Sequence, residues 1–412
     1  MRPEPLAHIA WLGKKSPFCG NVTYSLSTTE RLREHGHQVS FIHFDTPAAG
    51  LGRSWDTGHQ VEASPSGSQV PTDHTGPGGD DVTLPYLVKS QVYTIPSPGA
   101  QRELRESLER LRPDLVHASL TLSPLDFRLP DLCQHLGVPL VATFHPAFDA
   151  GLRNITAGTQ QLTYQLYAPA LARFDRVIVF SELQAEVLAR LGVREERLAV
   201  IPNGVDPDLW CPPDPTSPSR ELTTLRARLG PRRLFLYMGR LATEKNVEAL
   251  LRAWRLVKPA GCLLVIVGDG PLRQALQGNS DEHDVLWWGY EANLHQRVAL
   301  LQAADVFLLP SLVEGLSLAL LEAMASGTAC VATDAGADGE VLEGGAGIVI
   351  STQGVTTQLR TLLPVLRDQP VLTTELGRRA RERVLERYTL ASNIAQLERL
   401  YADLVPQGSL AA

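Results

Sequence analysis

The chain is poor in cysteine and contains no long apolar run. No pair of its five cysteines has the spacing of a metal site or a redox motif; they are Cys19, Cys133, Cys211, Cys262 and Cys330. Cys133, Cys262 and Cys330 stand in apolar segments, so we expect buried free thiols and a reducing, cytoplasmic compartment. No segment approaches the about 20 apolar residues of a spanning helix. The N-terminal MRPEPLAHIAWLG is too short and broken for a signal peptide, so we expect no transmembrane segment, while peripheral membrane contact stays open.

Positive charge is also not in excess. Lysine and arginine number 38 against 45 aspartate and glutamate residues, a formal net charge of −7. This balance argues against nucleic acid as a partner recruited by bulk charge. Hydrophobic residues at 44% and charged residues at 20% are ordinary for a soluble globular protein. At about 150 residues per domain, the 412 residues correspond to about two to three domains.

The most informative stretch is DVFLLPSLVEGLSLALLEAMASGTACVAT, residues 305–333. It predicts a strand at Val306–Leu309, a loop, a helix that begins at Leu318 after the cap Ser317 and ends before Gly327, and a strand at Thr328–Thr333. The loop leaves the carboxyl end of a strand and enters a helix N-terminus, where α/β folds bind ligands and unpaired amides favour phosphate. Glu314 in the loop and Glu322 in the helix could therefore flank one bound molecule. The alternative is an ordinary amphipathic helix with Glu322 exposed.

Strand, loop and helix recur along the whole chain, which predicts an α/β protein with two doubly wound sheets. The expected strands are 7–12, 38–44, 114–118, 138–143, 176–180 and 199–201 in the first half, and 234–238, 262–267, 285–289, 306–309 and 328–333 in the second. We expect a first domain at 1–202, a linker at 203–232, a second domain at 233–387 and a C-terminal helix within 388–412. Residues 46–84, rich in Pro, Gly, Ser and Asp, are expected to be a flexible insertion.

His145 follows the expected strand at 138–143, at the carboxyl end where a cleft would lie. A histidine bonded within a loop is the alternative, and Asp149 could orient the ring. The helix expected at Asn154–Arg173 carries Leu162, Leu166 and Tyr167 on one face. We expect this stripe to pack in the core, with interfacial membrane contact as the alternative.

The loop GRLATEKN after the strand at 234–238 holds Arg240 and Lys245. A diphosphate group carries about two negative charges, whereas a helix N-terminus offers about half a positive charge. Fixed cations are needed when no metal is present, and Arg240 provides a planar fork while Lys245 provides a point charge. The alternative is a pair of surface cations beside Glu244.

The segment EGLSLALLEAMASG resembles the signature of retaining nucleotide-sugar glycosyltransferases of the GT-B fold, and GRLATEKN resembles their donor-phosphate loop. The resemblance implies two Rossmann-like domains that face a cleft, a donor held mainly by the second domain, and a C-terminal helix that crosses back to the first. In this helix Leu390, Ile394, Leu397 and Tyr401 stand at helical spacing. It also implies retention of the anomeric configuration, hence an α-linked product, without an obvious protein nucleophile.

The resemblance assigns roles to individual residues. The implied catalytic residues are His145, Glu314, Arg240 and Lys245, and the implied donor-binding residues are Gly20, Arg240, Lys245, Gly289, Glu314, Gly315, Leu316, Ser317, Leu318 and Glu322. Cys19 stands where a second glycine is usual, and Trp288 or Tyr290 could flank the base. No metal or cofactor is expected, because the carboxylate pair at 206–208 lies in a proline-rich linker away from any phosphate-binding turn.

The acceptor side resembles a narrower group. GKKSPFCGNVTYS, LVKSQVYTIP and HASLTLSPLDF resemble cyanobacterial-type digalactosyldiacylglycerol synthases. This implies transfer of galactose from UDP-galactose to monogalactosyldiacylglycerol, a lipid acceptor at a membrane surface. The alternatives are a glucosyl- or mannosyltransferase with another lipid, soluble or cell-envelope acceptor, a GT-B sugar-nucleotide epimerase, and a non-catalytic nucleotide-binding module.

Overall fold

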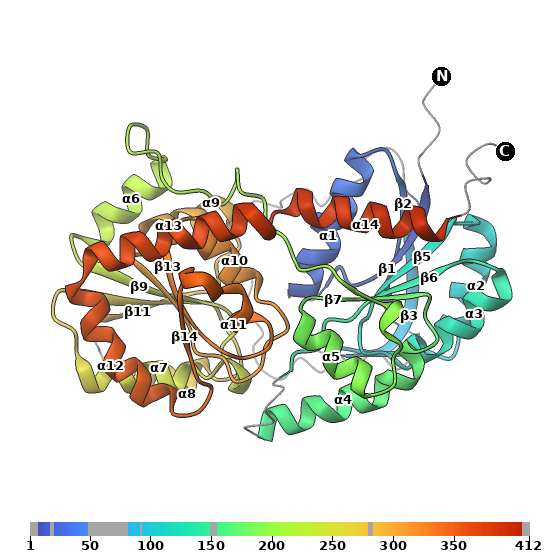
Figure 1. Ribbon diagram of the computed structural model, residues 1–412, viewed down its shortest axis with the longest axis horizontal. Helices are drawn as coiled ribbons and strands as arrows, with labels where there is room; N and C mark the ends of the chain where they lie inside the picture. Colours follow the sequence, from blue (N-terminus) through green and yellow to red (C-terminus); the bar gives the residue numbers. More distant parts are fainter. Residues whose placement is uncertain are drawn as a thin grey trace.

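The structure is a computed structural model that describes residues 7–16, 20–47, 81–90, 93–148, 155–278 and 283–405. The chain forms two α/β lobes, each built on one sheet with helices packed against it (Figure 1). This arrangement confirms the predicted fold class of two Rossmann-like doubly wound domains. Figure 1 also shows that α14, the last helix, runs from the second lobe along the first.

The first lobe contains a sheet of eight described strands in the order β4-β3-β2-β1-β5-β6-β7-β8. Its strands are β1 (His8–Leu12), β2 (Gln38–Pro47), β3 (Val82–Lys89), β4 (Thr94–Pro96), β5 (Leu115–Ser119), β6 (Leu140–Thr143), β7 (Arg176–Val179) and β8 (Leu198–Val200). Its helices are α1 (Gly20–Glu34), α2 (Ala100–Leu111), α3 (Leu129–Leu136), α4 (Ile155–Leu171) and α5 (Glu182–Arg190). Only the β3–β4 pair of the described strands is antiparallel.

The second lobe contains a parallel sheet of six described strands in the order β11-β10-β9-β12-β13-β14. Its strands are β9 (Arg233–Met238), β10 (Cys262–Val267), β11 (Val285–Gly289), β12 (Val306–Leu309), β13 (Ala329–Thr333) and β14 (Ile348–Ile350). Its helices are α6 (Arg220–Leu229), α7 (Val247–Val257), α8 (Arg273–Gln277), α9 (Leu294–Ala303), α10 (Leu318–Ala325), α11 (Asp338–Val341), α12 (Val355–Asp368) and α13 (Pro370–Arg387), and α14 (Leu390–Leu404) follows them.

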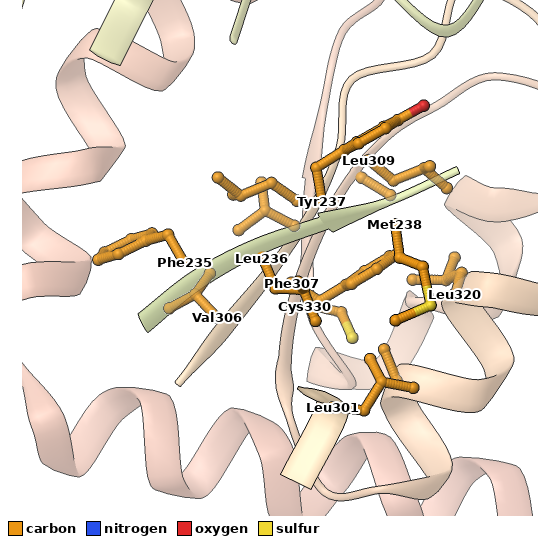
Figure 2. Packing of buried hydrophobic residues seen from close by; sticks show 14 of the residues in the cluster. Phe235, Leu236, Tyr237, Met238, Leu301, Val306, Phe307, Leu309, Leu320 and Cys330 are labelled. Carbon is orange, nitrogen blue, oxygen red and sulfur yellow. The ribbon is translucent and has the colours of Figure 1, made fainter. Parts of the chain in front are cut away.

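The continuous apolar runs are buried strands, as expected for a parallel sheet covered on both faces. The predicted strands 262–267, 285–289 and 306–309 have the observed bounds, and the other predicted strands differ by one to three residues at an end. Tyr237 and Met238 point to opposite sides of β9 (Figure 2), and Met238 belongs to the same buried cluster as Leu320 of α10. This packing fixes α10, and with it Glu322, against the sheet.

Two predicted boundaries are wrong. The insertion expected at 46–84 is too long, because residues 46–47 belong to β2 and residues 82–84 to β3, which pair in parallel; residues 48–80 lie outside the described part of the chain. The segment that forms β3 is short and contains Pro85, so its alternation of apolar and polar residues was hard to detect. The linker expected at 203–232 is also too long, because α6 buries Leu222, Leu225 and Leu229 in the core of the second lobe.

The core-facing stripe predicted on α4 is wrong for two of its three residues, Leu162 and Leu166, and right for Tyr167. Leu162 and Leu166 are 64% and 63% exposed, whereas Tyr164 and Tyr167 are buried. The two tyrosines can face the core because both hydroxyls have partners. Tyr164 donates to the Pro146 carbonyl at 2.8 Å, and Tyr167 donates to the Asp126 carboxylate of η1 (Pro124–Arg128) at 2.9 Å. A satisfied hydroxyl lets a large aromatic ring be buried without an unpaired polar atom.

The chain passes between the lobes at two adjacent places. Val205 and Thr389 form a parallel bridge, and the Val205 amide donates to the Tyr388 carbonyl at 3.0 Å. A side chain at Gly204 would place its Cβ 2.4 Å from the Thr389 carbonyl oxygen, so only glycine fits there. Beyond this crossing α14 packs on the first sheet, where Ile394 and Leu397 share a buried cluster with Ile9, Trp11 and Phe41.

Candidate active site

The loops at the carboxyl edge of the second sheet cross one another at glycines. A Cβ on Gly268 would lie 1.9 Å from the Gly239 carbonyl oxygen, and one on Gly336 would lie 2.0 Å from the Glu314 carbonyl oxygen. Both residues have positive φ, +132° and +57°, which favours glycine. The loops after β9, β10, β12 and β13 are therefore packed backbone to backbone, which brings residues far apart in sequence to one place.

Glu314 and Lys245 lie in direct contact. The Lys245 Nζ donates to the Glu314 Oε1 at 2.6 Å, and the Ser311 hydroxyl donates to the same oxygen at 2.7 Å. The Glu314 side chain is only 8% exposed. The two residues belong to separate sequence motifs and were predicted to lie around one ligand. The structure brings them together.

The loop that holds Glu314 is fixed from three directions through its carbonyl groups. The Glu314 carbonyl accepts from the Phe148 amide of the first lobe at 2.8 Å, and the Gly315 carbonyl accepts from the Ala337 amide at 2.8 Å. The Leu316 carbonyl accepts from the Asn203 side chain at 3.1 Å. Both lobes and the linker thus set the position of Glu314 before any ligand binds.

Arg240 lies on the same loop as Lys245 and forms an ion pair with Glu244. Burial opposes ionisation of Glu244, but the hydrogen bond from Arg240, a backbone hydrogen bond and the charges of Arg240 and Lys245 together outweigh it, and the Glu244 pKa is lowered. The Tyr237 hydroxyl donates to the Arg240 carbonyl at 2.8 Å, and the Leu312 amide donates to the Glu244 carbonyl at 2.8 Å. The loop after β9 is therefore attached to the loop after β12.

Glu322 is buried in α10 and forms an ion pair with Arg297 of α9, whose Nη2 lies 3.0 Å from Oε1 and 2.8 Å from Oε2. Burial raises the pKa of Glu322, and Arg297 opposes this shift. The alternative of an exposed Glu322 on an ordinary amphipathic helix is thereby excluded, and the carboxylate lies inside the second lobe.

Asp338, the first residue of α11, is fully buried next to this cluster. Its Oδ1 accepts from the Ser317 amide at 3.0 Å, and burial together with the nearby Glu314 raises its pKa well above the usual range. Ser317 also caps α10 through its hydroxyl, which accepts from the Leu320 amide at 3.3 Å. The predicted cap is confirmed, and α11 adds a second contact to it.

His145 faces the loop of Glu314 from the first lobe. A Cβ on Gly315 would lie 3.1 Å from the His145 carbonyl oxygen. The His145 Nε2 lies 2.8 Å from the Ser119 hydroxyl, and the ring packs edge to face on Tyr24 at 5.0 Å between centroids. Burial, with a smaller contribution from Lys14, lowers the pKa of His145 to about 3, so the ring is neutral near pH 7.

A second neutral histidine lies behind His145. His117 of β5 is fully buried, and its pKa is lowered to about 3, mainly by burial. Its Nε2 lies 2.7 Å from the Thr143 hydroxyl, and its Nδ1 lies 2.6 Å from the Tyr401 hydroxyl of α14. Helix α14 thus contacts the polar residues that lie behind His145 in the first lobe.

The other predicted donor residues lie at the expected ends of elements. Gly20 begins α1 and has no atom within 4 Å of a Cβ position, and Leu318 begins α10. Gly289 ends β11 with φ +91°, and its carbonyl accepts from the Gly268 amide at 2.7 Å. Cys19 and Asp149 lie outside the described residues.

The two aromatic candidates for base contact differ. Trp288 already has partners within the protein: its indole donates to Glu291 at 3.0 Å, and the Arg228 guanidinium lies 4.9 Å from its ring centroid. Tyr290 is 58% exposed at the end of β11. Of the two, Tyr290 has the accessible surface that a stacked base would require.

The carboxylate pair at 206–208 lies in a turn, where Asp206 has structural partners. Asp206 accepts from Arg31 of α1 at 2.6 Å and from the Asp208 amide at 3.0 Å, which makes it a turn residue. Within the described ranges no three potential ligands are grouped as a metal site would require. Metal-independent activity stays a prediction.

The site residues that were not predicted from the sequence are Arg297, Asp338, His117, Ser119 and Tyr24. For His117 and Ser119 a signal existed, because two polar residues at a spacing of two in the apolar strand LVHAS share one face. For Arg297 no local signal existed, because its partner Glu322 is 25 residues away on another helix.

Comparison with known families covers both lobes. The family described as Glycosyltransferase Family 4 matches residues 20–209, and the family described as Glycosyl transferases group 1 matches residues 232–368. A glycogen synthase from Mycobacterium tuberculosis is 30% identical over 302 residues, which are 69% of this chain and 68% of that protein. A GDP-mannose-dependent alpha-(1-6)-phosphatidylinositol dimannoside mannosyltransferase from the same species is 28% identical over 299 residues, 71% of this chain and 75% of that protein.

Solved structures share the fold over almost the full length. Sucrose-phosphate synthase from Thermosynechococcus elongatus has a TM-score of 0.72 at 20% identity and covers 97% of this chain and 99% of its own. Anabaena HepE in complex with UDP-glucose has a TM-score of 0.69 at 18% identity, with 96% and 100% covered. The two-lobed architecture, the family matches over both lobes and the named relatives agree, and the chain belongs to the group 1, family 4 glycosyltransferases of the GT-B fold, as a hexosyltransferase that uses a nucleotide sugar.

Proposed function

We propose that the protein transfers a hexose from a nucleoside diphosphate sugar to an acceptor hydroxyl with retention of the anomeric configuration and without a metal ion. The observation that carries the proposal is the contact of Lys245 with Glu314, beside Arg240 on one side and opposite His145 on the other. In this assignment Lys245 and Arg240 neutralise the departing diphosphate, where transition-state charge accumulates. Glu314 accepts from the sugar hydroxyls, and Glu322 accepts from the ribose hydroxyls.

His145 acts in this proposal as a neutral hydrogen-bonding group. Its pKa of about 3 excludes proton uptake near pH 7. The bond from the anomeric carbon to the diphosphate oxygen breaks, the acceptor oxygen bonds to the same face of that carbon, and the acceptor proton passes to the leaving diphosphate oxygen. Atoms and charge balance in this step without a protein nucleophile, and closure of the lobes would exclude water and favour transfer over hydrolysis.

For the acceptor, we propose monogalactosyldiacylglycerol with UDP-galactose as donor, on the sequence resemblance alone. The helices in the described residues are too short or too polar to traverse a bilayer. The exposed Leu162 and Leu166 of α4 offer one apolar contact for peripheral binding at a lipid surface.

A glucosyl- or mannosyltransferase with another acceptor is the second candidate. It is favoured by the named relatives, a glycogen synthase and a phosphatidylinositol dimannoside mannosyltransferase. The neutral imidazole of His145 on the first lobe suits a sugar hydroxyl on any of these acceptors.

The test is a labelled-donor assay with the purified chain and EDTA. UDP-galactose, UDP-glucose, ADP-glucose and GDP-mannose are each combined with monogalactosyldiacylglycerol vesicles, phosphatidylinositol vesicles or a soluble glucan, and Lys245→Met is the inactive control. We expect label in one acceptor, with an α-linkage by NMR, and no stimulation by manganese. Label confined to galactolipid supports the first acceptor, and label in another acceptor supports the second candidate.

Two outcomes contradict the proposed function. Conversion of the sugar nucleotide into an isomer without transfer would identify an epimerase. Binding of a nucleotide without turnover of any donor would identify a non-catalytic module.

A further inference from the structure

The contact between Arg297 and Glu322 uses only part of the carboxylate. An ionised carboxylate has about four acceptor positions, two on each oxygen. Arg297 occupies one on Oε1 at 3.0 Å and one on Oε2 at 2.8 Å. Each oxygen therefore keeps one position, and two vicinal ribose hydroxyls can donate to the two that remain.

Arg297 itself is held by the linker between the lobes. Trp210 is buried, and the Arg297 guanidinium lies 5.3 Å from the centroid of its ring. The Trp210 carbonyl accepts from Arg381 of α13 at 3.2 Å, so the ring is fixed by its own backbone. A partly buried guanidinium over an indole face is a favourable cation–π arrangement.

We infer that Arg297 is a positioning residue of the donor site, which holds the Glu322 carboxylate so that one acceptor position on each oxygen is presented to the ribose, with Trp210 of the linker fixing Arg297 in turn. The inference rests on the proposed function, since it requires a nucleotide at Glu322. It adds two residues, one on α9 and one in the linker, to the donor site.

The ion pair also sets the charge of Glu322. Burial raises the pKa of this carboxyl, and Arg297 opposes the shift. Of the charged groups in the described residues, Arg297 on α9 is the one that acts on it, while Arg381 on α13 bonds the Trp210 and Ala325 carbonyls. Loss of Arg297 leaves the pKa of Glu322 higher, so binding that needs the ionised form fails at a higher pH than in the wild type.

Isothermal titration of the full chain tests the inference. Among UDP, GDP and ADP, the tightest binder to the wild type is compared with its 2′-deoxy counterpart. We expect the wild type to prefer the ribonucleotide by about tenfold, and we expect Glu322→Gln and Arg297→Met to lose most of this preference. Arg252→Met is the matched control, since Arg252 forms an exposed pair with Glu248 on α7, and it should keep the preference.

The pH dependence separates positioning from a structural role. In Arg297→Met the acid limb of nucleotide binding should move to higher pH, and Arg297→Lys, which keeps the charge, should move it back. Trp210→Leu, which leaves the ion pair in place, should weaken the preference in the same direction. If Arg297→Met does not fold, as judged by circular dichroism, Arg297→Lys and Trp210→Leu decide the question.

The inference is overturned if Glu322→Gln loses the preference for ribose while Arg297→Met, folded, keeps it with an unmoved acid limb; the proposed function then stands. Failure of the wild type to bind any of the three diphosphates would instead remove the proposed function on which the inference rests.

Discussion

The two lobes bring different chemistry to the place where the loop of Glu314 meets His145. On the second lobe, charged side chains lie in buried or partly buried ion pairs: Lys245 with Glu314 at 2.6 Å and Arg297 with Glu322 at 2.8 Å. On the first lobe, the side chains in direct contact with His145 are a hydroxyl and aromatic rings, and Lys14 is a buried cation nearby. The pKa values of His145 and His117 are lowered to about 3, mainly by burial. The second lobe carries paired charges at the site, whereas the groups that contact His145 on the first lobe are neutral.

This difference fits the two ligands of a glycosyl transfer. A diphosphate brings charge, and a site with paired cations can accept it when each cation exchanges one anionic partner for another. An acceptor hydroxyl brings no charge, and neutral groups can orient it without stabilising an ion at the wrong moment. The comparison therefore predicts that variants on the second lobe affect charge stabilisation and variants on the first affect the geometry of transfer.

The largest expected effect is at Lys245. Lys245→Met should lower kcat by about a thousandfold, because the leaving diphosphate loses a cation and Glu314 is left buried without its partner. Steady-state kinetics measure this loss. Lys258→Met, at an exposed lysine at the end of α7, is the control and should retain wild-type kcat. Near wild-type turnover of Lys245→Met would end the argument that this lysine neutralises the leaving group.

A smaller effect is expected at His145. His145→Ala should lower kcat by about a hundredfold while donor affinity changes by less than about threefold, because the ring supports the reacting sugar and does not hold the diphosphate. Kinetics and calorimetry measure the two quantities. His135→Ala, at an exposed position at the end of α3, serves as the control. A loss of donor affinity with unchanged kcat would move His145 out of the reacting region.

Alanine substitutions at one glycine of each lobe test the difference between the lobes directly. Gly336→Ala should destabilise the protein by about 1–3 kcal/mol and weaken donor binding, because the new Cβ would lie 2.0 Å from the Glu314 carbonyl oxygen. Gly20→Ala should leave stability unchanged, since no atom lies within 4 Å of its Cβ position. Urea unfolding measures stability. If Gly20→Ala nevertheless lowers activity, a ligand approaches the backbone there, as the resemblance implies; equal stability losses in both variants would contradict the comparison.

The last prediction concerns the dependence of stability on acid pH. The folded protein keeps His117 neutral down to about pH 3, whereas the unfolded chain protonates it near the ordinary value of 6.5, so stability is full above this range and falls as the pH drops through it. His117→Asn should reduce the slope of stability against pH in this window by about 1.4 kcal/mol per pH unit. Urea titrations at several pH values measure the slope. An unchanged slope would show that His117 does not contribute.

The fold was largely predictable because the information was local. Short apolar runs such as CLLVIV at 262–267 favour buried strands of a parallel sheet, and Ser317 with Gly327 marked both ends of α10. The prediction failed on α4, where Leu162 and Leu166 are exposed. There the buried face depends on hydroxyl partners in η1 and after β6, which no helical periodicity records.

The site was predictable where a motif carried it and not where contacts are tertiary. Glu314, Lys245 and Arg240 stood in two recognisable loops, and their contact follows from adjacent parallel strands β9 and β12. Arg297 and Asp338 act through residues 25 and 21 positions away, so their partners are set by the packing of α9 and α11. Burial, which sets the pKa of both histidines, is likewise a property of the whole lobe.

The paired crossing of the chain at Val205 and Thr389 has a consequence for how the enzyme turns over. Two bodies joined by two neighbouring backbone segments can bend easily about one axis, while twisting and sliding are resisted by the bridge and by the close fit at Gly204. We therefore expect the two lobes to open and close by a hinge rotation about this crossing. The same small rotation would admit the donor, align His145 with Glu314 and let the nucleotide leave.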